Sequence, residues 1–298
     1  LMQRARSWTI ASIALAMVVA GVIATTWSVQ QRRTQVEAAA MPTAPADAGL
    51  AAAATGAGAL GVLDLGDGDR ICRQELSRLR RTAPGPYGVR VTARCALTPA
   101  DLSDGPGLVV LTADLTAADT PWNITEMAAE LRVLAEVTDL TQARAAVRAG
   151  AHGLIARGSE SGGRTGSLST FVLLQQLLAD TELADSPVWA CGGVGPRTAA
   201  AAMAGGGAGV VLDSQLALLP ESRLPEAVRA VLRSLDGAET MVIGGHRVLR
   251  RRGPDAPPLP ADDPVAIAAL LGARDPARQL LPLGQDGFLA ARFAERWG

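Results

Sequence analysis

The chain has 298 residues, 48% of them hydrophobic and only 3% aromatic, with a formal net charge of −1 at pH 7. This length is sufficient for one large α/β domain, whose core must be built mainly from Ala, Val and Leu. The nearly neutral charge excludes the basic surface that nucleic-acid binding requires, so no nucleic-acid partner is expected.

The N-terminal segment, residues 1–34, contains an apolar run with the features of a membrane span. No charged residue occurs between positions 7 and 31, and Trp8 and Trp27 stand near the two ends of the run. About 20 apolar residues cross a bilayer, and tryptophan favours its interfaces. We predict a transmembrane helix at 7–29 that anchors the protein, with the rest of the chain in the cytoplasm. The alternative is a cytoplasmic, soluble protein in which this segment is not native or forms a buried helix.

Residues 35–236 show short apolar runs that alternate with helical patterns, as a parallel α/β fold requires. Eight such strand and helix units within about 200 residues favour a TIM (β/α)8 barrel over an open sheet. The first strand has the weakest pattern. The predicted strands are 36–41, 60–65, 87–93, 108–113, 133–138, 153–157, 187–191 and 209–212, and the predicted helices are 46–56, 69–81, 124–131, 140–149, 168–178, 197–204 and 225–235.

After residue 235 the alternation ends, and residues 237–298 are expected to form a proline-rich linker and a short C-terminal helical extension. Residues 250–260 combine three arginines with several prolines, which is typical of a surface linker. The chain ends in an amphipathic helix that carries Phe288, Leu289 and Phe293. This helix is predicted to pack against the barrel.

Three glycine-rich turns follow predicted strands, at 158–166, 191–195 and 205–209. Glycines directly after a strand let backbone N–H groups approach an anion, and a following helix adds its positive end. The later two turns flank the seventh and eighth strands, where TIM barrels often bind phosphate. The turns therefore predict a phosphate-binding site at the C-terminal end of the barrel.

From residue 41 to 214 the sequence resembles the nitronate monooxygenase (2-nitropropane dioxygenase) family of FMN-dependent TIM barrels. It is most similar to the barrel domain found in some polyketide and polyunsaturated fatty-acid synthases. The resemblance is carried by the stretches 50–63, 158–163, 191–194 and 209–214, and by Gly284 with Gln285 near the C-terminus. It implies FMN as cofactor, bound through Gly162, Gly163, Gly192, Gly193, Val194, Asp213 and Ser214.

Two positions depart from the family pattern. The family's usual catalytic histidine follows the Gly-Gly pair, where this chain has Arg164. Arginine stays protonated and only donates hydrogen bonds, so Arg164 cannot remove a proton from a nitroalkane. It can stabilise a reduced flavin, a carbonyl or an enolate, so Arg164 is a candidate catalytic residue, with Glu136 to orient it or to contact the flavin.

The second departure is Asp213, where the family usually has glycine. If its carboxylate faces the phosphate, the two repel. If it faces a helix N-terminus or an arginine, FMN can still bind.

Cysteine and histidine offer little other chemistry. The three cysteines are widely spaced and are expected to be reduced, and the two histidines leave no basis for a metal site. His152 precedes a predicted strand, and a structural hydrogen-bonding role is expected for it.

The leading hypothesis is therefore an FMN-dependent oxidoreductase that acts on an acyl, enoyl or nitronate-type substrate. A non-catalytic barrel that serves as a structural or docking module of a polyketide-synthase-like protein is the alternative, with acyl-handling synthase domains as partners. The glycine turns alone also allow a barrel that binds a phosphorylated sugar or a nucleotide without redox chemistry.

Overall fold

The computed structural model describes residues 35–39, 46–66, 68–102, 105–112, 120–250, 259–260, 263–273 and 279–297. The predicted transmembrane helix at 7–29 and most of the proline-rich linker lie outside these ranges. Within them, no helix has the length and hydrophobicity that crossing a membrane requires.

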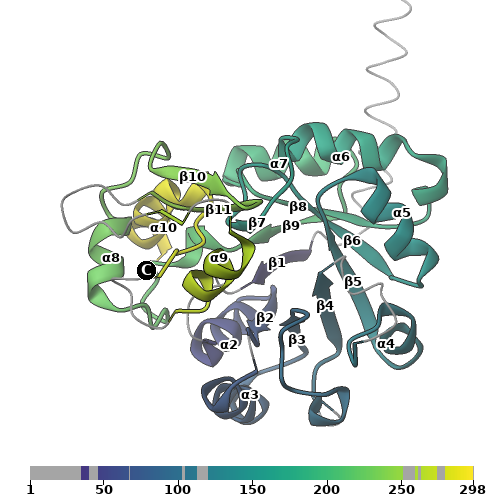
Figure 1. The fold of residues 1–298 in the computed structure, drawn as a ribbon, viewed down its shortest axis with the longest axis horizontal. Coiled ribbons are helices and arrows are strands. Elements are labelled where there is room, and N and C mark those ends of the chain that lie inside the picture. Colours follow the sequence, from purple (N-terminus) through teal and green to yellow (C-terminus); the bar gives the residue numbers. More distant parts are fainter. Residues whose placement is uncertain are drawn as a thin grey trace, which may run out of the picture.

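Eight parallel strands close into a barrel, as the alternation of strands and helices predicted (Figure 1). The barrel closes because β1 pairs with β2 on one side and with β9 on the other. Even the weak first strand is therefore part of the ring. The barrel strands are β1 (Gln35–Ala39), β2 (Leu60–Asp64), β3 (Tyr87–Val91), β4 (Leu108–Thr112), β5 (Arg132–Val137), β6 (Gly153–Arg157), β8 (Val188–Cys191) and β9 (Gly209–Leu212).

Helices connect the strands around the outside of the barrel, and several begin at a side chain that caps their first N–H groups. Asp47, Asp69 and Asp139 accept hydrogen bonds from the first turns of α2, α3 and α5. Helix α6 is capped by Ser169, whose side chain accepts the N–H of Val172. The helices are α2 (Ala48–Gly56), α3 (Arg70–Thr82), α4 (Ile124–Glu130), α5 (Leu140–Arg148), α6 (Thr170–Ala179), α7 (Pro196–Ala204) and α8 (Glu226–Leu232).

Two apolar layers result from the alternation of side chains along the strands. On β5, Val133 and Ala135 pack in the cluster beneath the helices, whereas Leu134 joins the cluster inside the barrel. Side chains two residues apart share a face of a strand. Residues that follow Leu134 at intervals of two along β5 therefore also face the barrel interior.

A small antiparallel sheet lies beside the barrel, in the order β10–β11–β7. Strands β10 (Thr240–Ile243) and β11 (His246–Leu249) form a hairpin, and β7 (Gly163–Arg164) lies within the first glycine-rich turn. Gly244 and Gly245 have φ of 52° and 74°, the conformation of a two-residue hairpin turn that glycine favours. Neither the hairpin nor β7 is predicted from the sequence, because neither belongs to the alternation of strands and helices.

The C-terminal extension packs against the barrel, as expected. It contains α9 (Pro264–Leu271), a short 3-10 helix η5 (Gln285–Phe288) and α10 (Leu289–Trp297). Leu281, Leu283 and Ala290 form one core with Val228 and Leu232 of α8. Figure 1 shows α8, α9, α10 and the hairpin gathered on one side of the barrel. The extension is thus a structural part of the domain.

We expect Leu283→Ala to lower the free energy of unfolding by about 2–5 kcal/mol, because truncation of a buried leucine leaves a cavity. Leu283 is fully buried, whereas Val265 of α9 is 78% exposed, so Val265→Ala is the control and should change stability little. Urea denaturation measures both. Equal, small effects would show that the extension does not pack as described.

Candidate functional site

Polar side chains take the last inward positions of the strands at the C-terminal end of the barrel. Val62, Leu134 and Ile155 lie in the interior cluster, and two residues beyond each of them stand Asp64, Glu136 and Arg157. Arg90 and Thr112 take the matching positions on β3 and β4. All five polar side chains are buried. The apolar interior therefore ends in a charged layer, at the face where TIM barrels carry their active sites.

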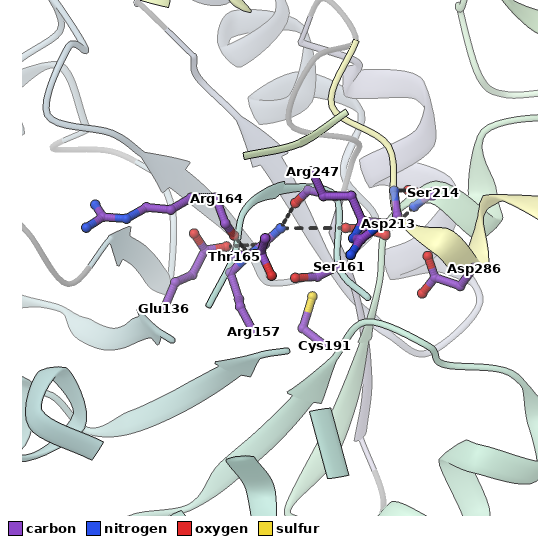
Figure 2. A network of polar contacts seen from close by, with 12 residues as sticks. Glu136, Arg157, Ser161, Arg164, Thr165, Cys191, Asp213, Ser214, Arg247 and Asp286 are labelled. Atoms are coloured by element: carbon purple, nitrogen blue, oxygen red, sulfur yellow. Dashed lines mark hydrogen bonds and ion pairs between the residues drawn. The ribbon is translucent and has the colours of Figure 1, made fainter. Parts of the chain in front are cut away.

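The charged residues alternate in sign and form a continuous row of ion pairs. Arg90 contacts Asp64 through Nη1 at 2.8 Å and binds both carboxylate oxygens of Glu136 at 3.0 and 2.8 Å. On its other side, Glu136 accepts a hydrogen bond from Nη1 of Arg157 at 2.8 Å. Nη2 of Arg157 lies 3.9 Å from Asp213. Figure 2 shows this row from Glu136 through Arg157 toward Asp213.

The ion pairs hold Glu136 and Arg90 in their charged forms. Burial alone would raise the pKa of Glu136, but Arg157 and Arg90 lower it to about 2. Burial alone would lower the pKa of Arg90, but Glu136 and Asp64 raise it above its ordinary value. Asp64, with one arginine partner, has a pKa that burial raises. Glu136 is therefore an ionised carboxylate whose oxygens are engaged by two arginines.

The glycine-rich turn at 158–166 is fixed from beneath by Arg157. Its Nη2 donates to the carbonyl of Gly162, and its Nε donates to the carbonyl of Arg164 at 3.3 Å. Glu160 accepts hydrogen bonds from the backbone N–H and the hydroxyl of Thr170 at 2.9 and 3.0 Å, which ties the turn to α6. The turn is thus a rigid support for the residues above it.

The turn after β8 presents a cluster of polar groups, which we call the anion cradle: the N–H groups of Gly193 and Val194 with the side chain of Ser214. Gly192 and Gly193 have φ of 102° and 65°, and a Cβ on Gly192 would lie 2.6 Å from the backbone nitrogen of Ser161. Only glycine fits there. The resulting backbone conformation directs successive N–H groups toward one point.

The cradle is filled by the carboxyl group of Asp286, from the C-terminal extension. Oδ2 of Asp286 accepts from the N–H of Val194 at 3.2 Å and from Nε2 of Gln215 at 2.7 Å, and the N–H of Gly193 also bonds to this carboxyl group. The hydroxyl of Ser214 accepts the N–H of Gly284 at 3.1 Å. The donors of the cradle are therefore engaged by a carboxyl group of the same chain.

Asp213 faces both the start of a short helix and an arginine. Its carboxylate accepts the N–H of Ser214 at the start of the 3-10 helix η4 (Ser214–Leu216) and lies near Arg157. Burial, and then the neighbouring Asp213, raise the pKa of Asp286 well above its ordinary value. The carboxyl groups of Asp213 and Asp286 are therefore neighbours, and Arg157 lies near Asp213.

A cavity of about 690 Å³ opens beside the row of ion pairs, and we call it the mouth cavity. Three arginines, a histidine and four threonines contribute to its wall, and no carboxylate is among its described lining residues. The polar lining residues are Arg90, Thr92, Arg94, Thr112, Thr138, Arg164, Thr165 and His246. Pro264, Ile267 and Leu271 of α9 add an apolar side. This lining suits a partly apolar ligand with an anionic or carbonyl group.

The predicted site residues separate into two neighbouring groups. Gly163 and Arg164 line the mouth cavity, whereas Gly193, Val194 and Ser214 form the cradle. The remaining predicted residues support these groups: Gly162 and Gly192 pack beneath them, and Glu136 and Asp213 flank Arg157.

Five residues of the site were not predicted from the sequence: Asp64, Arg90, Arg157, His246 and Asp286. The first three could have been predicted, because each lies two residues beyond an inward-facing residue of its strand and so faces inward too. His246 and Asp286 reach the site through contacts between distant segments, which no local pattern reveals.

Comparisons with known proteins agree with this architecture. Residues 100–244 match the family model described as nitronate monooxygenase. The chain is 31% identical over 218 residues to a (3aS,4S,5R,7aS)-5-hydroxy-7a-methyl-1-oxo-octahydro-1H-indene-4-carboxyl-CoA dehydrogenase of Mycobacterium tuberculosis, a match that covers 69% of this chain and 60% of that protein. The chain thus spans less than two thirds of that relative.

Solved structures extend the likeness to most of the chain. FabK from Thermotoga maritima superposes with a TM-score of 0.70 at 27% identity, covering 87% of this chain and 88% of that chain. Nitroalkane oxidase from Streptomyces ansochromogenes shares the fold, with a TM-score of 0.65 at 24% identity, covering 90% of this chain and 96% of that chain. The resemblance to the nitronate monooxygenase family is confirmed.

We expect Glu136→Gln to lower the free energy of unfolding at neutral pH by about 3–5 kcal/mol, because the substitution removes the shared carboxylate from two buried arginines. The folded-state pKa of Glu136, about 2, lies below its ordinary 4.5. Its stabilising contribution is therefore complete above pH 4.5 and is lost as the pH falls toward 2.

Urea denaturation of both proteins across this pH range measures the effect. The difference between wild type and Glu136→Gln should shrink as the pH falls. A difference that does not vary with pH would contradict the ion-pair account.

Proposed function

We propose that this protein is an FMN-dependent oxidoreductase that acts on an acyl or enoyl substrate bound in the mouth cavity. The observation that carries the proposal is the adjacency of this cavity to the anion cradle. Two segments connect them. Residues 163–165 line the cavity while Ser161 packs against Gly192 below the cradle, and Pro282 lines the cavity while Asp286 occupies the cradle. A cofactor held by its phosphate in the cradle would therefore be next to a ligand in the cavity.

Relatives support the oxidoreductase class. The family model is that of a monooxygenase, and the Mycobacterium tuberculosis relative is by name a dehydrogenase of a carboxyl-CoA compound. A thioester substrate has a carbonyl that gains negative charge when the neighbouring carbon is deprotonated. The arginine-rich lining of the mouth cavity offers donors to such an oxygen.

The donors of the cradle fit the phosphate of FMN. The Asp286 carboxyl group already accepts hydrogen bonds from the N–H groups of Gly193 and Val194. These two residues, with Ser214, would hold the phosphate, and FMN when bound would supply hydride exchange with the substrate. Because a carboxyl group and a phosphate cannot share the same donors, Asp286 must leave the cradle for FMN to bind in this way.

The chain's own residues supply binding and polarisation. Arg164 has its backbone carbonyl fixed by Arg157 and its side chain at the wall of the mouth cavity. A guanidinium stays protonated, so its role is to donate hydrogen bonds to the thioester oxygen. Glu136 acts beneath it by holding Arg157 in place, which makes Glu136 a positioning residue.

The second candidate is a barrel without redox activity, acting as a docking module for acyl-handling synthase domains. Two observations favour it. Asp286 makes several hydrogen bonds inside the cradle, and the flanking Leu283 is fully buried, so displacement of the segment is costly. Asp213 adds a second carboxyl group beside any incoming phosphate. FMN binding therefore distinguishes the two candidates.

We expect the full chain, supplied with FMN and reduced without oxygen, to be reoxidised by crotonyl-CoA, as followed by flavin absorbance. Arg164→Ala should slow reoxidation by about 10²-fold, because it removes a donor to the developing oxyanion. Arg148→Ala, whose side chain is 68% exposed on α5, is the matched control. A folded protein that stays colourless with excess FMN would reject this function in favour of the docking module.

We also expect Asp286→Ala to tighten FMN binding by at least about tenfold, because the substitution removes the group that holds the cradle closed. Riboflavin lacks the phosphate, so its affinity should not change. Equilibrium dialysis measures both ligands, with Asp286→Asn as an uncharged variant of similar shape and exposed Glu295→Ala of α10 as the control. Equal gains for FMN and riboflavin would show that Asp286 does not act through the phosphate.

A further inference from the structure

His246 stands directly opposite Arg164 in the small antiparallel sheet. The two residues are register partners of β11 and β7, and both line the mouth cavity. Residues directly opposite each other in an antiparallel pair have their side chains on the same face of the sheet. The hairpin therefore places an imidazole beside the guanidinium that the substrate oxygen is proposed to contact.

The hydrogen bond of the imidazole fixes which nitrogen can accept a proton. Nδ1 of His246 lies 2.9 Å from the carbonyl oxygen of Gly244. A carbonyl can only accept, so Nδ1 carries the hydrogen, and in the neutral ring Nε2 retains its lone pair. The hydrogen bond is made within the hairpin turn itself, which keeps the ring orientation independent of any ligand.

The surroundings keep the ring neutral. Burial is the main cause that lowers the pKa of His246 below its ordinary 6.5. The positive charges of Arg164, Arg94 and Arg157 lower this pKa further, whereas the hydrogen bond to Gly244 raises it. The helix packed on the turn contributes Ile267, which is apolar. An imidazole in this setting is unprotonated near neutral pH and available as a base.

We propose that His246 is a catalytic acid–base residue that exchanges a proton with the carbon next to the substrate carbonyl. In the forward direction Nε2 takes the proton and the C–H electron pair becomes an enolate, whose oxygen receives hydrogen bonds from Arg164. The imidazolium returns the proton in the reverse direction, so no oxidant or reductant is consumed in this step. The inference rests on the proposed function, because it places the acyl thioester in the mouth cavity.

The test is incorporation of solvent deuterium at the α-carbon of butyryl-CoA, a saturated thioester, by the full chain, measured by mass spectrometry. This exchange needs no redox turnover. We expect His246→Gln to slow it by at least about 100-fold. His152→Gln is the matched control, since it alters the only other histidine, whose Nδ1 accepts the N–H of Val133.

The pH dependence separates a catalytic from a structural role. Wild-type exchange should rise with pH as the imidazolium loses its proton and level off above a midpoint that lies below 6.5. In His246→Gln this rise should be absent while the circular dichroism spectrum is unchanged.

Exchange that His246→Gln leaves intact would overturn the inference. Wild-type protein that reoxidises with crotonyl-CoA but shows no exchange would overturn the inference alone. Absence of both reactions in folded protein would overturn the inference together with the proposed function.

Discussion

The rest of the site depends on the hydrogen bonds and ion pairs that the buried guanidinium of Arg157 makes. It joins Glu136 in the row of ion pairs, lies near Asp213, and binds two carbonyls of the turn at 158–166. A buried charge of this kind is costly unless its partners satisfy it, so removal of either side leaves an uncompensated charge. Because Arg157 holds the turn, residues 163 and 164 are placed where they pair with β11 as β7. The barrel interior thus determines the geometry of the loops above it.

The remaining residues of the site come from segments that follow the barrel in the sequence. β11 pairs with β7 and brings His246 beside Arg164, while the following extension brings Asp286 into the anion cradle. Arg247 also donates to the carbonyl of Ser159, so the hairpin and the turn hold each other. The two groups with most influence on the proposed chemistry, an imidazole and a competing carboxyl group, are therefore both supplied by residues after the barrel. In the family that this chain resembles, histidine is usual at position 164; here arginine stands there, and the imidazole lies on the neighbouring strand.

The sequence was sufficient to predict the barrel but not the full site. Strand periodicity and helix caps are local, so the eight parallel strands followed from patterns such as that of β5, and the glycines of the cradle followed from their place after a strand. His246 and Asp286 could not be located in this way, because strand register and packing against distant elements decide their positions. The hairpin was an avoidable omission, since Gly244 and Gly245 between two β-rich runs are a recognised turn signal.

A crystal structure of the full chain grown with saturating FMN and butyryl-CoA tests the account most directly. In this crystal we expect the FMN phosphate on the N–H groups of Gly193 and Val194, with Asp286 turned out of the cradle. We also expect the thioester carbonyl within hydrogen-bond distance of Arg164 and the α-carbon next to Nε2 of His246. A structure in which Asp286 keeps these N–H groups and neither ligand is bound would contradict it.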